Sequence, residues 1–163
     1  MIKQCTVEDL KNNRVTKQHG QIVLITRFYP RFLKKNLFHE YQACLAPTRE
    51  LLKEFKDCEK TLFAADPISL DVAHSKGFIE MDYESKFTLS EEGLAQLKRL
   101  SQLSTGSAVF LACHCPVGIR CHRELLMIIG EKIFGAKIAR LHFQWTTFRK
   151  RLLEGDARRI RHS

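Results

Sequence analysis

The residues best suited to chemistry cluster in one segment of eleven residues, from Cys113 to Arg123. Its sequence is Cys-His-Cys-Pro-Val-Gly-Ile-Arg-Cys-His-Arg, which contains three of the six cysteines, two histidines and two arginines. Thiolates are nucleophiles and metal ligands, imidazoles exchange protons near neutral pH, and guanidinium groups bind phosphate through paired donors. The segment therefore allows an anion site, a thiol nucleophile, a metal site or a purely structural loop.

The surroundings of this segment favour anion binding. The apolar residues 107–112 predict a buried strand before it, and the apolar spacing in residues 124–134 predicts a helix after it. The free N–H groups and the dipole of a helix N-terminus attract phosphate. Arg120 and Arg123 could add charged donors, and His122 could add a further hydrogen bond.

A thiol nucleophile is one alternative for the same segment. A cysteine at a helix N-terminus beside arginine and histidine has a lowered pKa. Cysteine-dependent phosphatases use a cysteine, a loop and an arginine in this strand–loop–helix setting, and the run His114, Cys115, Gly118 and Arg120 is similar to their motif. The spacing from Cys115 to Arg120 is one residue shorter than those enzymes require, which changes the loop amides that meet the phosphate.

A metal site is a second alternative. No cofactor is expected, and zinc is the one that these residues would allow. Cys113, Cys115, Cys121 and His122 would supply the four ligands of a closed structural zinc site. Their spacing is not that of a zinc knuckle, and the adjacent Cys121 and His122 would be strained as ligands of one ion. A tightly packed structural loop would explain the small thiols but not the arginines and the histidine.

A second group of candidates follows another predicted strand. The β-branched residues 21–26 predict a buried strand, and residues 27–35 then interleave aromatic rings with positive charges. Rings stack on nucleobases, and arginine and lysine pair with phosphates. We expect Arg27 and Arg31 to be functional and Phe32 to belong to the core. If the two predicted strands are neighbours, both loops line one crevice at the carboxyl edge of the sheet.

The order of elements predicts an α/β fold, a single three-layer domain with a mostly parallel sheet and flanking helices. Residues 1–148 would form this domain, and residues 149–163 a basic C-terminal tail. Two further helices are expected, one in residues 36–45 and one beginning near Pro47. A capping box at Thr88 to Glu91 predicts another helix, whose buried stripe would be Leu94, Leu97, Leu100 and Leu103. The helix after the motif is expected to end at Gly135 as its C-cap, and residues 137–143 to form a third strand.

Composition and charge narrow the class of protein. With 163 residues, of which 44% are hydrophobic, the chain can form one domain with a real core. The net charge of +9 and the pI near 9.4 favour polyanionic partners, namely nucleic acid, nucleotides or an acidic membrane surface. The tail carries six basic and two acidic residues, a net +4 that could serve nucleic-acid binding.

The expected location is the cytoplasm. No apolar run is long enough to span a bilayer and no secretory signal is recognisable, so we expect a soluble cytoplasmic protein with no membrane partner. A disulfide framework is not expected in that compartment. The scattered Cys5, Cys44 and Cys58 are therefore expected to be small buried side chains.

Two separated motifs resemble those of the prokaryotic domain-of-unknown-function family 488. The resemblance covers roughly residues 21–134 and implies a small single-domain α/β protein with no established activity. Cys115 stands where relatives commonly carry another residue, often an acidic one. The residues that carry the resemblance are Arg27, Tyr29, Pro30 and Arg31 in the first motif, residues 45–48 with Leu51 and Phe55 after it, and Cys113, Cys121, His122 and Arg123 in the second.

Together these features predict that the protein binds a phosphate-bearing small molecule or nucleic acid in a basic crevice at the carboxyl edge of the sheet. In an enzyme, the arginines would position phosphate, although no carboxylate near the motifs offers a general base. The alternatives are a thiol-dependent enzyme, phosphatase-like or sulfur-transferring, and a nucleic-acid-binding module without catalysis. The predicted site residues are Cys113, Cys121 and His122 as catalytic groups, and Arg27, Tyr29, Arg31, Arg120 and Arg123 as ligand-binding groups.

Overall fold

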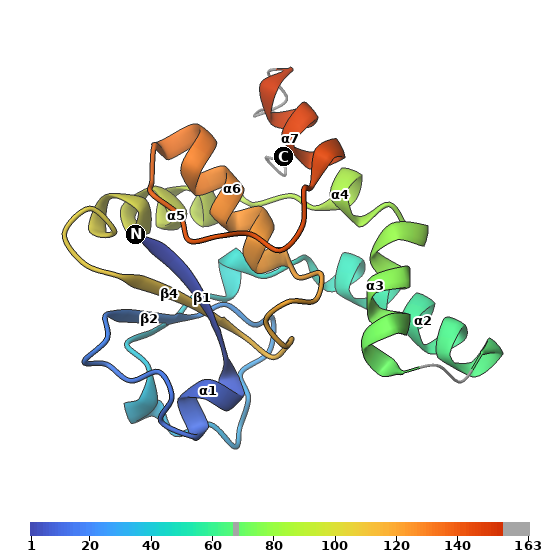
Figure 1. Ribbon diagram of the computed structural model, residues 1–163, viewed down its shortest axis with the longest axis horizontal. Coiled ribbons are helices and arrows are strands. Elements are labelled where there is room, and N and C mark those ends of the chain that lie inside the picture. The colour runs from blue at the N-terminus through green and yellow to red at the C-terminus, as the bar shows by residue number, and fades with distance from the viewer. Residues whose placement is uncertain (67–68, 155–163) are drawn as a thin grey trace.

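A four-stranded parallel sheet forms the centre of the molecule (Figure 1). The computed structural model describes residues 1–66 and 69–154. Within these residues the strand order is β1-β4-β2-β3, and every pair of neighbours is parallel. The α/β class and the parallel sheet predicted from the sequence are therefore confirmed. The strands are β1 (Ile2–Thr6), β2 (Gln21–Leu24), β3 (Glu40–Tyr41) and β4 (Val109–Cys113).

Both faces of the sheet are buried. Consecutive residues of each strand point to opposite sides, and each side packs into its own hydrophobic cluster. In β4, Leu111 belongs to the larger hydrophobic cluster and Phe110 to the smaller one. In β2, Val23 and Ile22 divide in the same way. This explains why the sequences of these strands are continuous apolar runs without alternation.

Helices complete the three layers. In Figure 1, α5 and α6 cover one face of the sheet, where their side chains fill the larger cluster. The other face is covered by α1 and by the segment from Tyr29 to Tyr41, which fill the smaller cluster. The helices are α1 (Val7–Lys11), α2 (Arg49–Ala65), α3 (Leu70–Glu80), α4 (Tyr83–Lys86), α5 (Glu91–Leu103), α6 (His122–Phe134) and α7 (Thr146–Leu153).

Local capping determines where the main helices begin and end. Thr48 caps α2, its hydroxyl accepting the N–H of Leu51 at 3.1 Å. The cap of α5 is Ser90 and not the predicted Thr88, because the Ser90 hydroxyl accepts the N–H of Gly93. Gly135 ends α6 with a φ of 68°, which confirms the predicted C-cap.

The predicted helix over residues 36–45 is wrong. Two short 3-10 turns, Lys35–Leu37 and Ala43–Leu45, flank strand β3 instead. The N–H groups of His39 and Gln42 donate to the carbonyl groups of β2, at Ile22 and Leu24. Pairing with the sheet therefore outweighs the helical spacing of the apolar residues.

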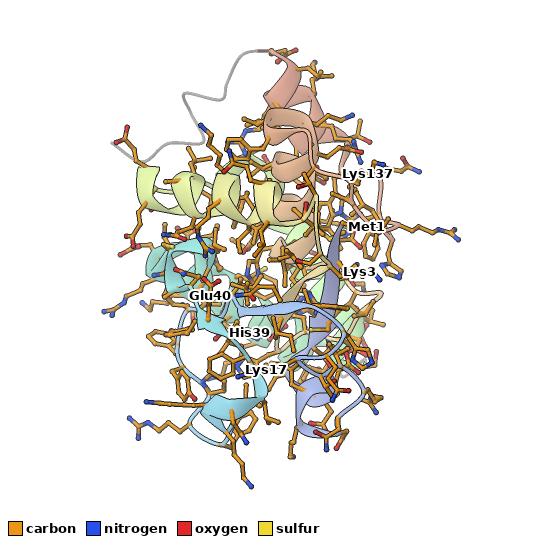
Figure 2. All side chains as sticks on the ribbon, turned by 90° about the vertical axis from the view of Figure 1, so that its left-hand side faces the viewer. Met1, Lys3, Lys17, His39, Glu40 and Lys137 are labelled. Carbon is orange, nitrogen blue, oxygen red and sulfur yellow. The ribbon has the colours of Figure 1, made fainter. Side chains whose placement is uncertain are left out.

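The predicted strand at residues 137–143 is also wrong. Only Ile138 forms a bridge to the sheet, opposite Ile2, before the chain turns away. Figure 2 shows Lys137 near Met1, at the beginning of β1. Two strands of the sheet were not predicted, namely β3 and the N-terminal β1, which pairs with β4.

Several side chains differ from their expected burial. Phe32, predicted to lie in the core, is 62% exposed. In α5, Leu97 and Leu100 are buried as predicted, whereas Leu103 is exposed. Of the cysteines outside the motif, Cys5 is buried and the others are only partly covered.

The basic tail begins inside a helix. Its first residues, Arg149 to Leu153, belong to α7, and residues 155–163 of the predicted tail lie outside the described residues. None of the helices in the described ranges combines the length and the apolarity that crossing a membrane would require.

Candidate functional site

A cavity of about 200 Å³, which we call the thiol cavity, lies where β4 ends and α6 begins. The predicted neighbours β2 and β4 do pair, so the loops that follow them meet at one edge of the sheet, as expected. Helices α2 and α3 close the other side. Six lining residues are apolar or aromatic (Phe28, Pro47, Leu52, Phe55, Phe78 and Tyr83), and nine are polar or contain sulfur (Thr26, Arg27, Lys56, His74, Cys113, His114, Cys115, Cys121 and His122).

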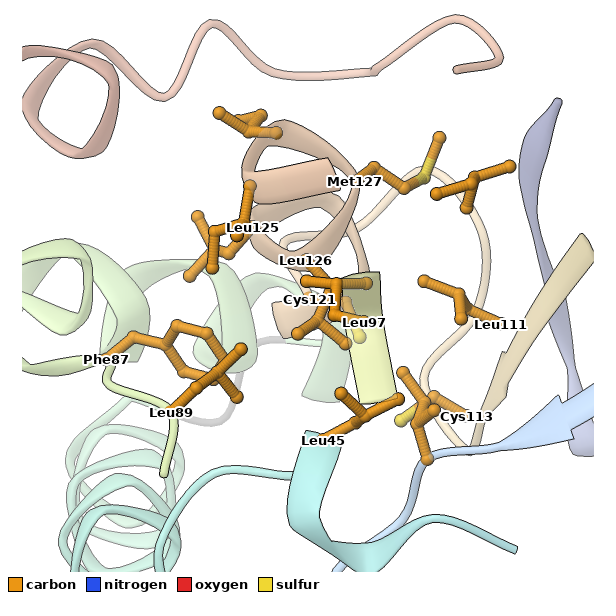
Figure 3. Close-up of a cluster of buried hydrophobic side chains, with 14 of the residues drawn as sticks. Leu45, Phe87, Leu89, Leu97, Leu111, Cys113, Cys121, Leu125, Leu126 and Met127 are labelled. Atoms are coloured by element: carbon orange, nitrogen blue, oxygen red, sulfur yellow. The ribbon is translucent and has the colours of Figure 1, made fainter. Parts of the chain in front are cut away.

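Three thiols, those of Cys113, Cys115 and Cys121, line this cavity together. Figure 3 shows Cys113 and Cys121 among the side chains of the larger hydrophobic cluster. Cys113 lies at the end of β4, and Cys121 is the N-cap residue of α6. Cys115 lies between them in the loop and is only partly buried. The motif predicted from sequence is therefore brought together at one point.

The three thiols are not equivalent. Burial alone would raise the pKa of Cys121, but hydrogen bonds with Cys113 and Cys115, together with the neighbouring His122 and Arg123, hold this pKa well below its ordinary value. For Cys113, hydrogen bonding with Cys115 lowers the pKa of the thiol. Hydrogen bonding with Cys121 and burial have the opposite and larger effect, and they raise this pKa to about 12. Hydrogen bonds with Cys113 and Cys121 also raise the pKa of Cys115. Cys121 is thus the one of the three thiols that loses its proton most readily.

His122 is oriented to accept a proton from Cys121. Its Nε2 lies 3.1 Å from the carbonyl oxygen of Ile25, and its Nδ1 lies 3.7 Å from the Sγ of Cys121. A carbonyl oxygen only accepts, so Nε2 carries the hydrogen, and the lone pair of Nδ1 faces the sulfur. The thiol, the imidazole and the carbonyl therefore stand in the order that a nucleophile, its base and an orienting group take in nucleophilic enzymes.

Arg123 is fully buried and holds the loop of the motif in place. Its guanidinium group donates to the carbonyl oxygens of Cys115 at 2.7 Å and Pro116 at 2.9 Å, and also to that of Cys5 in β1. These contacts join the loop to the sheet and place a permanent positive charge beside the thiols. The N–H groups of Arg123, which were predicted to bind a ligand, therefore bind backbone carbonyl groups of the protein itself.

The other predicted ligand-binding residues are scattered around the site. Arg27 lines the cavity, but its guanidinium group donates to the carbonyl oxygens of residues 46 and 47. Arg120 stacks on Phe143, 4.8 Å from the ring centre, and pairs with Glu84 at 3.7 Å. Tyr29 and Arg31 do not line the cavity. The hydroxyl of Tyr29 donates to the carbonyl of Leu33, and Arg31 is exposed.

Sequence reasoning missed one buried pair that supports the site. Nδ1 of His74 lies 2.8 Å from a carboxylate oxygen of Glu59, and Nε2 lies 2.8 Å from the carbonyl oxygen of Arg120. The pair thus connects α2 and α3 to the residue before Cys121. Glu59 and His74 lie on different helices, so no spacing in the sequence indicated their contact.

A second buried carboxylate, Glu124, was also missed. It accepts hydrogen bonds from the indole N–H of Trp145 at 2.6 Å and from the backbone N–H of His142 at 2.8 Å. Burial raises its pKa, but these hydrogen bonds outweigh burial and leave the pKa below its ordinary value. Glu124 follows Arg123 directly in the motif, and its carboxylate fixes residues 142–145 over α6.

The described residues contain one trio of donors close enough to chelate a metal ion. The ligand atoms of Cys113, Cys121 and His122 lie within 4.8 Å of one another. The Sγ of Cys121 and the Nδ1 of the adjacent His122 lie 3.7 Å apart, so the two neighbouring side chains do face one point. The trio is one donor short of a closed structural zinc site.

The sequence was compared with curated proteins, solved structures and models of protein families, and only a family model matches it. No curated protein and no solved structure matches the chain. One family model, described as the active DUF488-N3 subclade, matches residues 5–131 and so includes β2, β3, β4 and the motif of the thiol cavity. The chain therefore belongs to the DUF488 family, as its two motifs suggested.

Proposed function

We propose that the protein is a thiol-dependent enzyme in which Cys121 is the nucleophile and His122 is its proton acceptor. The observation that carries the proposal is the 3.7 Å contact between Cys121 Sγ and His122 Nδ1, with Nε2 held by the carbonyl of Ile25. The pair faces the thiol cavity, where a substrate packed against the rings of Phe55, Phe78 and Tyr83 can exclude water. The description of the matching subclade as active is in keeping with an enzyme.

The arrangement supports covalent catalysis in two steps. Cys121 gives its proton to His122, and the sulfur then attacks an electrophilic atom of the substrate. A bond forms between sulfur and that atom while the bond to the leaving group breaks, and the leaving group takes the electron pair and the proton from His122. Water or another acceptor, deprotonated by His122, then displaces the thiolate. The thiols of Cys113 and Cys115 stabilise the negative charge on sulfur before attack.

This proposal accounts for the site better than phosphate binding inside the cavity does. The guanidinium groups of Arg27 and Arg123 are engaged by backbone carbonyls, and that of Arg120 lies against Glu84. A phosphate would have to compete with these contacts. The thiols and imidazoles, in contrast, face the cavity directly.

Selective alkylation tests the proposal. At about pH 6 we expect iodoacetamide to modify Cys121 at least about tenfold faster than Cys44 or Cys58, since burial raises the pKa of those two thiols and only the thiolate reacts. The rates are obtained by mass spectrometry of peptides after timed quenching.

Two matched variants complete this experiment. Cys121→Ser should remove the fast modification, whereas Cys44→Ser should leave it unchanged. Modification of Cys121 that is no faster than that of Cys44 and Cys58 would exclude an activated thiol and with it the proposed function.

A further inference from the structure

An exposed group of rings and cations borders the mouth of the thiol cavity. Phe28 and Phe32 are 60% and 62% exposed, although both are large aromatic side chains. Arg49, which contacts Phe28, is also exposed, and so are Arg31, Lys34 and Lys35, which are close to the two rings in the sequence. We call this group the aromatic–basic rim; it consists of Phe28, Arg31, Phe32, Lys34, Lys35 and Arg49.

Direct contacts connect the rim to the cavity. Phe28 itself lines the cavity, and the guanidinium group of Arg49 lies 5.8 Å from the centre of its ring. The ring of Phe32 lies 6.1 Å from that of His114, which also lines the cavity. A ligand in the cavity can therefore reach both exposed rings and the guanidinium group of Arg49.

The charge of the rim is uncompensated. No acidic residue occurs between positions 27 and 39. In the ranges that the structure describes, Arg31, Lys34, Lys35 and Arg49 take part in no ion pair. Free cations beside exposed rings are the arrangement that binds single-stranded nucleic acid, where rings stack on bases and cations contact phosphates.

From this juxtaposition we infer that the substrate of the thiol cavity is single-stranded nucleic acid. This inference rests on the proposed function and names the substrate class of the same site. One base enters the cavity, its neighbours stack on Phe28 and Phe32, and their phosphates lie against the cations of the rim. Duplexes are poor ligands because their bases are already stacked and paired.

The cavity fits a base better than a larger group. Its volume of about 200 Å³ is below the roughly 300–1,000 Å³ typical of sites for drug-sized ligands. Phe55, Phe78 and Tyr83 give it aromatic walls. Thr26 is 4% exposed and lines the cavity, and within residues 1–66 and 69–154 its hydroxyl has no hydrogen-bond partner. A base edge would satisfy that hydroxyl.

Fluorescence anisotropy with labelled oligonucleotides of about 12 nucleotides tests the inference. We expect oligothymidylate or oligouridylate to bind at least about tenfold more tightly than a duplex of the same length. Each of Phe28→Ala and Phe32→Ala should weaken binding about fivefold or more, whereas Phe63→Ala, which removes an exposed ring on α2, should leave it unchanged.

Salt dependence tests the contribution of the cations. The double variant Lys34→Gln, Lys35→Gln should reduce the slope of log K against log salt by about 1.4 for single strands. The matched double variant Lys98→Gln, Lys137→Gln removes the same charge from other exposed positions and should leave the slope unchanged. Equal slopes for the two variants, or equal affinities for single strand and duplex, would overturn the inference.

The outcomes separate this inference from the proposed function. If Cys121 is rapidly alkylated but no oligonucleotide binds, the substrate class is wrong and the thiol enzyme stands. If oligonucleotides bind and Cys121 is unreactive, the proposed chemistry is wrong. If both hold, bound oligothymidylate or oligouridylate should also protect Cys121 from iodoacetamide, and a mononucleotide at the same concentration should not.

Discussion

Replacement of Arg123 by methionine is expected to lower the free energy of unfolding by more than about 3 kcal/mol. The guanidinium group serves three carbonyl oxygens, and the loss of a partner costs about 1–3 kcal/mol for each polar group left buried and unsatisfied. The same change removes the positive charge that lowers the pKa of Cys121, so the thiol should also become less reactive. Denaturant unfolding measures the first effect, and alkylation under native conditions measures the second.

A lysine at position 123 separates charge from geometry. Arg123→Lys keeps the positive charge but cannot reach three carbonyls with a planar fork of donors, so we expect a stability loss with partly retained reactivity of Cys121. As a surface control, Arg140→Met should change stability by less than about 0.5 kcal/mol, since Arg140 is exposed. A neutral effect of Arg123→Met on stability would show that the loop does not depend on this residue.

Replacement of Glu124 by alanine is expected to cost about 3 kcal/mol or more. The carboxylate is 1% exposed and accepts from the side chain of Trp145 and from the backbone of His142 and Phe143, all of which would lose their acceptor. For a chain of this length the melting temperature should fall by roughly 6–12 °C. Glu131→Ala is the matched control, because Glu131 forms only surface pairs and should change stability by less than about 1 kcal/mol.

The pH dependence of stability gives a second readout for Glu124. Its pKa is lower in the folded protein than in the unfolded chain, where it is about 4.3, so its contribution is complete above that value and is lost as the pH falls through the folded pKa. The stability difference between the protein and Glu124→Gln should therefore shrink below about pH 4. A difference that stays constant into acid would contradict the assigned hydrogen bonds.

The sequence predicted those elements of the fold that are determined by residues close together in the chain. The apolar runs of β2 and β4 are buried on both faces, and the helix after the motif ends at Gly135 because glycine adopts a positive φ freely. The failures lie where distant contacts decide the structure. Residues 39–42 form hydrogen bonds with β2, and residues 142–145 are held by hydrogen bonds to the carboxylate of Glu124. Neither contact has a signature in nearby residues.

The sequence predicted which residues form the candidate site, but not which role each of them has. The motif from Cys113 to Arg123 was recognisable by composition, and adjacency of the two loops followed from parallel strands. Which thiol is activated depends on how the three thiols lie relative to one another and to His122 and Arg123, and the role of Arg123 depends on its burial. Phe32, which the sequence assigned to the core, is instead exposed, and its ring is therefore available for the base stacking that we infer.

The measurement that tests the central claim most directly is the rate of Cys121 alkylation as a function of pH, from about pH 5 to pH 9. Cys121 should react with a midpoint well below the value of about 8.5 for a free thiol, because neighbouring thiols, His122 and Arg123 stabilise its thiolate. His122→Asn should move the midpoint upward. A midpoint at or above that of a free thiol in the unaltered protein would contradict the account.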